Sequence, residues 1–187
     1  MKSTGIYLTF DGNCADAFAH YSTVFQKKLG TNMTNGDSPM KDKMPKELHD
    51  KIMHCSLDIG MGDKFQLMGS DRNPMMHKEP FQLGNNTQIS LTPHTKQETD
   101  RLFQELTSGG GKVLMPLAKQ FWGSYFGSLV DKFGIQWMFE FPLNADDNNK
   151  EETKQQDDGS NSKHKLGEEG DDKKDNEDEP VAKKAKK

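Results

Sequence analysis

The stretch from Phe121 to Phe141 constrains the fold of this chain most strongly. It contains two runs rich in aromatic and aliphatic residues, which favour a pleated, half-buried surface. Between them, Asp131 and Gly134 supply the backbone conformations that a chain reversal needs. The sequence therefore predicts a β-hairpin whose turn lies at residues 131–134.

The second arm of this hairpin has two different faces, because side chains alternate across a strand. One face is apolar and consists of Ile135, Trp137, Phe139 and Phe141. The other is mixed and consists of Gln136, Met138 and Glu140. We expect the apolar face to join a hydrophobic core and the mixed face to line a cavity.

The first half of the chain predicts a strand, a helix and then further strands. Residues 5–11 alternate as a strand, and an amphipathic helix is predicted from an Asn13 N-cap to an end near Gly30. The polar residues 31–50 predict at most one short strand and a loop. Two alternating strands are predicted within residues 51–70.

The second half predicts the same order of elements. Residues 87–92 alternate as a strand, and Thr95 with Glu98 forms a capping box for a second helix. A further strand is predicted from residue 112 to residue 117, stopped by Pro116. With the two arms of the hairpin, this half again contains a strand, a helix and three strands, which indicates an internal duplication of topology.

We therefore predict an α+β fold of paired βαβββ modules at about residues 5–70 and 86–142, within a folded domain of residues 1–143. The modules are expected to form an open, curled mixed β-sheet barrel with the helices on its convex face. The concave face is expected to line a pocket. Alternation assigns to it Tyr7, Thr9, His54, Ser56, Gln66, Met68, Gln88, Ser90, Met138 and Glu140.

The charge of the chain is distributed unevenly. Residues 144–187 carry 14 acidic residues and 10 lysines, which accounts for the whole net charge of −4. Because acidic and basic residues balance in residues 1–143, the folded domain is not expected to attract nucleic acid or an anionic membrane. Residues 144–187 contain too few apolar side chains to form a core and are predicted to be a disordered tail.

The cellular location is predicted from the absence of targeting signals. Cys14 and Cys55 lack metal-ligand spacing, and no apolar run marks a signal peptide or a membrane helix. We expect a soluble cytoplasmic protein. The cluster Lys183–Lys187 leaves two interpretations open, a nuclear-import signal or a solvated chain end without an address.

Three segments of the sequence resemble the PhnB-like branch of the vicinal oxygen chelate superfamily, which includes glyoxalase I, bleomycin-resistance proteins and extradiol dioxygenases. They are YLTFDGNCADAFAHY, KIMHCSLDIG followed by LMGSD, and FWGSYFGSLVDKFGIQW. The resemblance implies paired βαβββ modules in an open barrel, and a homodimer. Nothing predicts methyl transfer, because no glycine-rich nucleotide-binding turn follows a strand.

The same resemblance implies a divalent metal held by residues from the first and last strands of each module. The matching positions here are Gly5, Gln66 or Met68, Gln88 and Met138. Glycine and methionine do not supply the hard donors that such ions need, so we expect no metal cofactor. The alternative is a displaced metal site formed by His54, Gln88 and Glu140.

Two further groups of side chains allow more than one interpretation. His54, Ser56 and Glu140 suit acid–base chemistry, or they form a polar lining. Trp122, Tyr125 and Trp137 can stack on a planar ligand, or they pack in the core and a dimer interface.

Our leading hypothesis is a protein that binds a small organic ligand without a metal. Its predicted pocket is Tyr7, His54, Ser56, Met68, Gln88, Trp122, Tyr125, Met138 and Glu140. The alternatives are a divalent-metal-dependent lyase, isomerase or dioxygenase with the displaced site, and an interaction protein whose domain supports the charged tail.

Overall fold

The computed structural model describes residues 4–60 and 65–143, which belong to one compact unit, Met1–Ala145. The predicted tail, with its Lys183–Lys187 cluster, lies outside the described residues. The N-terminal module consists of β1 (Thr4–Phe10), α1 (Cys14–Val24), β2 (Leu29–Thr34), β3 (Ile52–Asp58) and β4 (Phe65–Asp71). The C-terminal module consists of β5 (Ile89–Leu91), α2 (Lys96–Thr107), β6 (Lys112–Lys119), β7 (Ser124–Val130) and β8 (Gln136–Pro142).

The two modules have the same sheet topology, which confirms the predicted duplication. The strand orders are β1-β4-β3-β2 and β5-β8-β7-β6. In each sheet the first strand of the module pairs in parallel with the last, and the other neighbours are antiparallel. Tyr7 stands opposite Met68 in the first sheet, as Ser90 stands opposite Met138 in the second.

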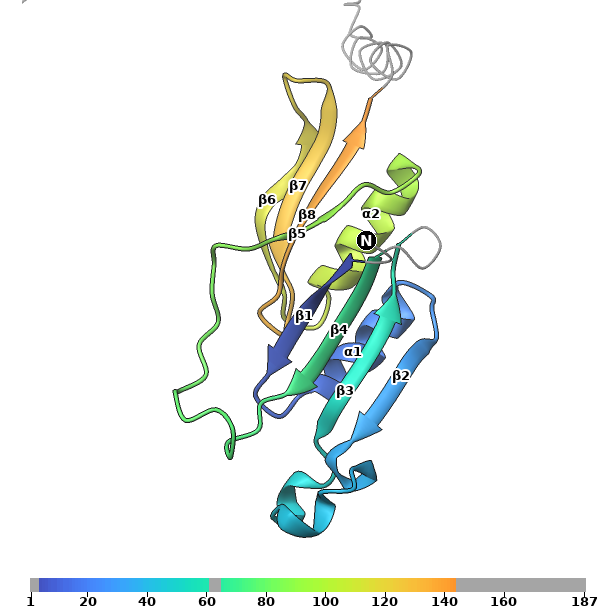
Figure 1. The fold of residues 1–187 in the computed structure, drawn as a ribbon. Helices are drawn as coiled ribbons and strands as arrows, with labels where there is room; N and C mark the ends of the chain where they lie inside the picture. The colour runs from blue at the N-terminus through green and yellow to red at the C-terminus, as the bar shows by residue number, and fades with distance from the viewer. Residues whose placement is uncertain (1–3, 61–64, 144–187) are drawn as a thin grey trace, which may run out of the picture. The chain divides into compact units, whose positions relative to one another are not determined.

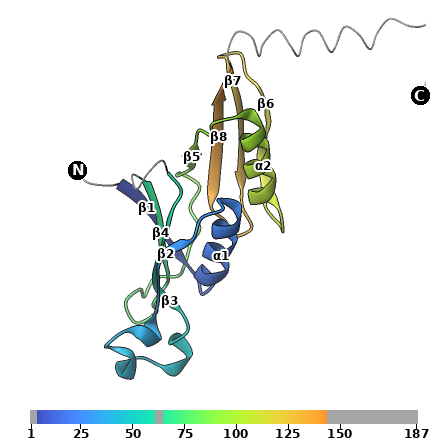
Figure 2. The same ribbon diagram turned by 90° about the vertical axis from the view of Figure 1, so that its right-hand side faces the viewer.

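Each sheet is covered by a helix on one face. Figures 1 and 2 show α1 against the first sheet and α2 against the second. The sheets do not close into a barrel. We call the face of each sheet that lies opposite its helix the open face. The βαβββ arrangement with helices on one side is thus as predicted, and the open faces correspond to the predicted concave side.

The core lies between the sheets and their helices and joins both modules. Leu57 and Leu67 of the first sheet and Trp137 and Phe139 of the second are fully buried within one cluster. The apolar face predicted for the second hairpin arm is therefore confirmed at its centre. Trp137 is a core residue, so its interpretation as a ligand-stacking side chain is wrong.

One buried carboxylate connects the modules. Asp131, at the β7–β8 turn, accepts hydrogen bonds from the Tyr21 hydroxyl at 2.7 Å and from Trp137 Nε1 at 2.9 Å. The backbone N–H groups of Phe133 and Ile135 donate to its other oxygen at 2.8 and 3.0 Å. Burial, and next the charge of Asp131, raises the pKa of Tyr21, so this phenol remains a proton donor.

The end of α1 differs from the predicted end near Gly30. The helix stops at Val24, and Gln26 adopts a left-handed conformation with φ of 53°. The Gln26 N–H donates to Thr23 O at 3.1 Å and the Lys27 N–H to Ser22 O at 3.0 Å. These two bonds form a Schellman motif, which ends the helix without a glycine.

The two helices begin differently, although both N-caps lie where predicted. Thr95 Oγ1 accepts the Glu98 N–H at 3.0 Å, while the Glu98 carboxylate accepts the backbone N–H of His94. Asn13 makes no side-chain cap bond. In its place Asp71, at the end of β4, accepts the Cys14 N–H at 2.9 Å.

The strands of the C-terminal module also differ in length from the prediction. β6 continues through Pro116. It is an edge strand, and its register with β7 shifts between Met115 and Ala118. A proline, which has no backbone N–H, is therefore tolerated at this position. β5 is limited to Ile89–Leu91. Residues 31–50 form the end of β2 and three short 3₁₀ turns, η1 (Asn35–Asp37), η2 (Lys41–Lys43) and η3 (Lys46–Leu48). No helix among the described residues is long and apolar enough to span a membrane.

Candidate functional site

An aromatic pair occupies the open face of the first sheet. The Tyr7 ring on β1 stacks on the His54 ring on β3, with centroids 5.7 Å apart and planes inclined by 22°. Tyr7 Oη lies 3.3 Å from His54 Nδ1. Tyr7 is 49% exposed and His54 is half-buried, so both rings remain accessible. The structure thus brings together two residues of the predicted pocket.

Methionines border this pair. Met68 on β4 lies in register between Tyr7 and Ser56, and Met33 on β2 stands opposite His54. A Cβ on Gly5 would collide with the Gln66 carbonyl oxygen and would lie 3.0 Å from the Met68 methyl group. Gly5 therefore makes room for Met68, and it offers no side-chain donor.

Ser56 has a structural partner. Its Oγ accepts the backbone N–H of Thr31 at 3.0 Å, and its residue is only 8% exposed. This bond holds the irregular strand β2 against β3. Although Ser56 lies on the predicted side of the strand, its hydroxyl oxygen is already used within the sheet.

The open face of the second sheet is more polar. Gln88 Nε2 donates to Gln136 Oε1 at 3.4 Å, and Gln136 Nε2 donates to Gly84 O at 3.1 Å. At the other end of β8 the Ser124 hydroxyl donates to Glu140 at 2.9 Å. Met138 is half-buried between these two polar pairs. Gln136 was missing from the predicted pocket, although alternation had assigned it to the mixed face.

An aromatic cluster lies beside Glu140. Trp122, between β6 and β7, makes edge contacts with Phe121 and Phe126 at centroid distances of 4.8 and 5.9 Å. Phe126 stands opposite Glu140 in the β7–β8 register. Trp122 is 48% exposed, so its ring is accessible for a ligand or for another protein surface.

Tyr125 does not face the predicted pocket. Its hydroxyl donates to Asp100 on α2 at 2.8 Å, and the Lys96 ammonium lies 4.2 Å from its ring centroid. Burial, together with the Asp100 hydrogen bond, raises the pKa of Tyr125. Ser124 and Phe126 occupy the open face instead, since neighbours along a strand alternate. The assignment of Tyr125 to the pocket is wrong.

The residues considered for a displaced metal site have separate partners. His54 lies on the first sheet with Tyr7, whereas Gln88, just before β5, bonds to Gln136 and Glu140 on β8 bonds to Ser124. Over residues 4–60 and 65–143, no group of three or more His, Cys, Asp or Glu lies close enough to hold a metal ion. The described part of the chain therefore does not bring His54, Gln88 and Glu140 together as one set of donors.

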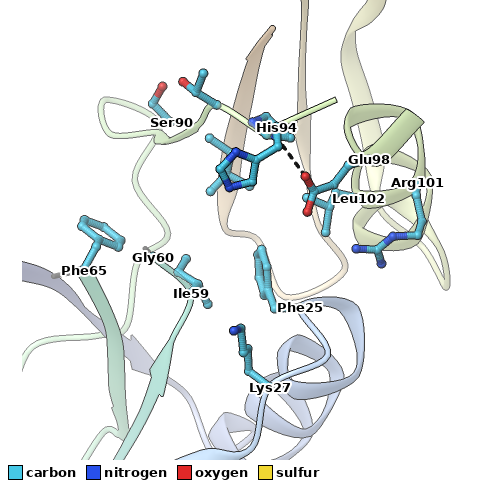
Figure 3. Close-up of a pocket in the computed structure, with 13 residues that line it drawn as sticks. Phe25, Lys27, Ile59, Gly60, Phe65, Ser90, His94, Glu98, Arg101 and Leu102 are labelled. Atoms are coloured by element: carbon cyan, nitrogen blue, oxygen red, sulfur yellow. Dashed lines mark hydrogen bonds between the residues drawn. The ribbon is translucent and has the colours of Figure 1, made fainter. Parts of the chain in front are cut away.

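Two cavities lie at the boundary between the modules. One, of about 320 Å³, adjoins the first open face and is lined by Tyr7 and Thr9 of β1, by the connector before β5, and by Gln136. The other, of about 410 Å³, lies at the end of α1, and Ser90 is the one residue among those assigned to the concave face that lines it (Figure 3). No pattern in the sequence pointed to its polar residues Lys27, His94 and Arg101, because they belong to different elements.

Comparison with known proteins places this geometry in context. A family model described as 3-demethylubiquinone-9 3-methyltransferase matches residues 2–139. The chain is 29% identical to the protein YjdN of Escherichia coli, over 71% of this chain and 90% of YjdN.

Solved structures agree with the fold. The crystal structure of protein PA1353 from Pseudomonas aeruginosa has a TM-score of 0.65 and 37% identity, over 77% of this chain and 99% of that chain. A putative 3-demethylubiquinone-9 3-methyltransferase, PhnB protein, from Bacillus cereus has a TM-score of 0.57 and 23% identity, over 75% and 99% of the two chains. At that identity the second likeness concerns the fold alone.

Proposed function

The chain belongs to the PhnB-like family described as 3-demethylubiquinone-9 3-methyltransferase, which has the glyoxalase/bleomycin resistance fold, and from this premise we propose that it binds a small planar organic molecule on its open faces. The observation that carries this proposal is the accessible stacked pair of Tyr7 and His54. Aromatic side chains that are not packed under a helix offer their ring faces to a ligand.

The side chains around the pair suit a flat ligand with few polar groups. Met68 and Met33 offer flexible thioether surfaces that adapt to different shapes. The Tyr7 hydroxyl and the His54 imidazole offer hydrogen-bonding atoms at one edge of the ligand. The cavity of about 320 Å³ beside Tyr7 is large enough for part of such a molecule.

We propose that this binding does not use a metal ion held by the open faces. Gly5 has no donor, Met68 and Met138 offer soft sulfur, and Gln88 is bonded to Gln136. Methyl transfer is also outside the proposal, since both described sheets contain antiparallel pairs and neither is the doubly wound parallel sheet of a nucleotide-binding domain.

We further propose that the functional protein is a homodimer. The edge strand β6 and the hairpin that follows it expose several large apolar side chains: Val113, Leu114, Met115, Phe121 and Trp122. Phe121 is 97% exposed, which favours burial against another protein surface. Sedimentation equilibrium is expected to show a dimer, and Phe121→Ser with Leu114→Ser is expected to shift it toward the monomer.

A neutral aromatic probe tests the proposed binding surface. 1-Naphthol is expected to bind to the protein in ligand-observed NMR, and His54→Ala is expected to weaken it about fivefold by removing half of the stacked pair. Met40→Ala, which removes an exposed methionine elsewhere, is the matched control. Equal binding by His54→Ala, Tyr7→Ala and the control would overturn the proposal. Stoichiometric metal in protein purified without chelator would overturn its metal-free part.

A further inference from the structure

The cavity of about 410 Å³ at the end of α1 is a second candidate site, which neither Tyr7 nor His54 lines. Figure 3 shows Phe25 and Lys27 entering it from the segment just after α1, Ile59 and Phe65 from the β3–β4 region, and Leu102 from α2. Its walls therefore come from both modules. Its volume lies within the range of small-molecule pockets.

Apolar and polar side chains both line this cavity. Phe25, Ile59, Phe65 and Leu91 are half-buried and Leu102 is buried, so their hydrocarbon surfaces face the space without filling it. An apolar group of a ligand would remove this surface from water, which is favourable.

Two cations lie beside the apolar wall. Arg101 Nη1 donates to Val24 O at 2.9 Å, which holds the guanidinium over the last turn of α1, close in sequence to Lys27. Nη1 also donates to Glu105 at 2.9 Å. Within residues 4–60 and 65–143, both hydrogen bonds of Arg101 use this nitrogen, and its other N–H groups have no acceptor. A guanidinium has five N–H donors, so some can serve a ligand.

Lys27 is the second cation. It is exposed, and within the part of the chain that the structure describes it makes no ion pair. The acidic side chain that lines the cavity, Glu98, is turned to the backbone N–H of His94 at 3.0 Å (Figure 3). That bond directs one of its oxygens to the backbone just before the N-cap of α2.

We propose that this inter-module cavity binds a small organic carboxylate, with its apolar body against Phe25, Phe65 and Leu102 and its carboxylate at Lys27 and Arg101. Bonds between a carboxylate and these cations are stronger than bonds between neutral groups. Because the walls come from both modules, the bound ligand bridges them and stabilises the folded domain by mass action.

Phenylacetate and its neutral analogue phenylacetamide test this proposal by isothermal titration calorimetry. Phenylacetate is expected to bind to one site and phenylacetamide about tenfold more weakly, since only the acid forms charge-assisted bonds. Lys27→Gln is expected to weaken phenylacetate about tenfold and to leave phenylacetamide unchanged. Lys28→Gln is the matched control, because Lys28 is also exposed but does not line the cavity.

A second variant tests the location without removing a charge. Thr92 lies exposed on the rim, and Thr92→Trp is expected to fill the entrance and abolish binding of both probes. His54→Ala is expected to leave phenylacetate binding unchanged, because His54 does not line the cavity, and this result separates the cavity from the Tyr7–His54 pair. The proposal is wrong if phenylacetate does not bind the native protein, if the amide binds as tightly, or if Lys27→Gln behaves like Lys28→Gln.

Discussion

The two modules have the same strand order, yet their helices contribute differently to the molecule. α1 packs on its own sheet and also reaches the other module, where Tyr21 meets Trp137 edge-on and bonds to Asp131. α2 packs mainly on its own sheet, and its Arg101 donates to the carbonyl oxygen of Val24 at the end of α1. The N-terminal helix thus connects the two modules, whereas the C-terminal helix mainly covers its own sheet.

This difference has a consequence for stability. Asp131 is 3% exposed, and all four groups that contact its carboxylate are hydrogen-bond donors. Loss of this acceptor leaves donors from both modules buried without a partner. The caps of the two helices, in contrast, affect one element at a time. Substitutions at Asp131 and at the caps therefore distinguish the stability that comes from contact between the modules from the stability that each helix start contributes.

Asp131→Asn is expected to have the largest effect. The amide nitrogen of asparagine must face a buried donor, so the free energy of unfolding is expected to fall by about 3 kcal/mol or more. Urea unfolding followed by tryptophan fluorescence measures this change. Asp11→Asn, at an exposed aspartate of the same charge, is the matched control.

A second variant assigns part of this loss to the contact between modules. Tyr21→Phe keeps the ring packing and removes one donor, at an expected cost of about 1–2 kcal/mol. Combined with Asp131→Asn, its additional cost is expected to be small, because the two residues share one interaction. Fully additive losses, or an Asp131→Asn variant as stable as Asp11→Asn, would contradict the role of Asp131 as a connection between the modules.

Local sequence patterns predicted the elements that this comparison uses, but not the contacts between them. The hairpin, its turn and the faces of β8 follow from alternation and from turn residues, which depend only on near neighbours. Asp131 was predicted only as a turn residue. Its bond to Tyr21 spans 110 positions in the chain, and no periodicity reports such a contact.

The candidate sites show the same contrast between what strand alternation predicts and what depends on contacts between distant segments. Tyr7 and His54 were correctly expected on one face, because each follows the alternation of a regular strand. Tyr125 was wrongly added for its aromatic character, although alternation relative to Ser124 and Phe126 decides its direction. The cavity at the end of α1 was not predicted, since Lys27 and Arg101 line one cavity only after the modules pack.

The helix caps provide the next test, with a smaller expected effect. Thr95→Ala removes a side-chain acceptor at the start of α2 and is expected to lower stability by about 1 kcal/mol. Asn13→Ala is expected to change stability by less than about 0.5 kcal/mol, because Asp71 and not Asn13 satisfies the Cys14 N–H. Thermal unfolding of both variants measures this contrast. Equal losses would show that the two helices are capped in the same way.

The smallest expected effect concerns His20, which lies on α1 next to Tyr21. Its ring contacts Tyr21 and Phe133, and Nε2 is buried without a hydrogen-bond partner in the described part of the chain. Burial, and next the charge of Lys132, lowers the pKa of His20, while Asp131 and Glu105 act in the opposite direction. The folded-state pKa therefore lies below the unfolded value of about 6.5.

Between these two pKa values the unfolded chain binds more protons than the folded chain, so stability rises with pH and is lost as the pH falls below about 6.5. His20→Phe keeps a ring in contact with Tyr21 and Phe133 and removes the titrating group. Urea unfolding at pH 5 and pH 7 is expected to show a smaller pH difference for this variant than for the native protein. His77→Gln, at an exposed histidine, is expected to leave the difference unchanged. If the free energy of unfolding of His20→Phe differed between pH 5 and pH 7 as much as that of the native protein, His20 would be excluded as a source of the pH dependence.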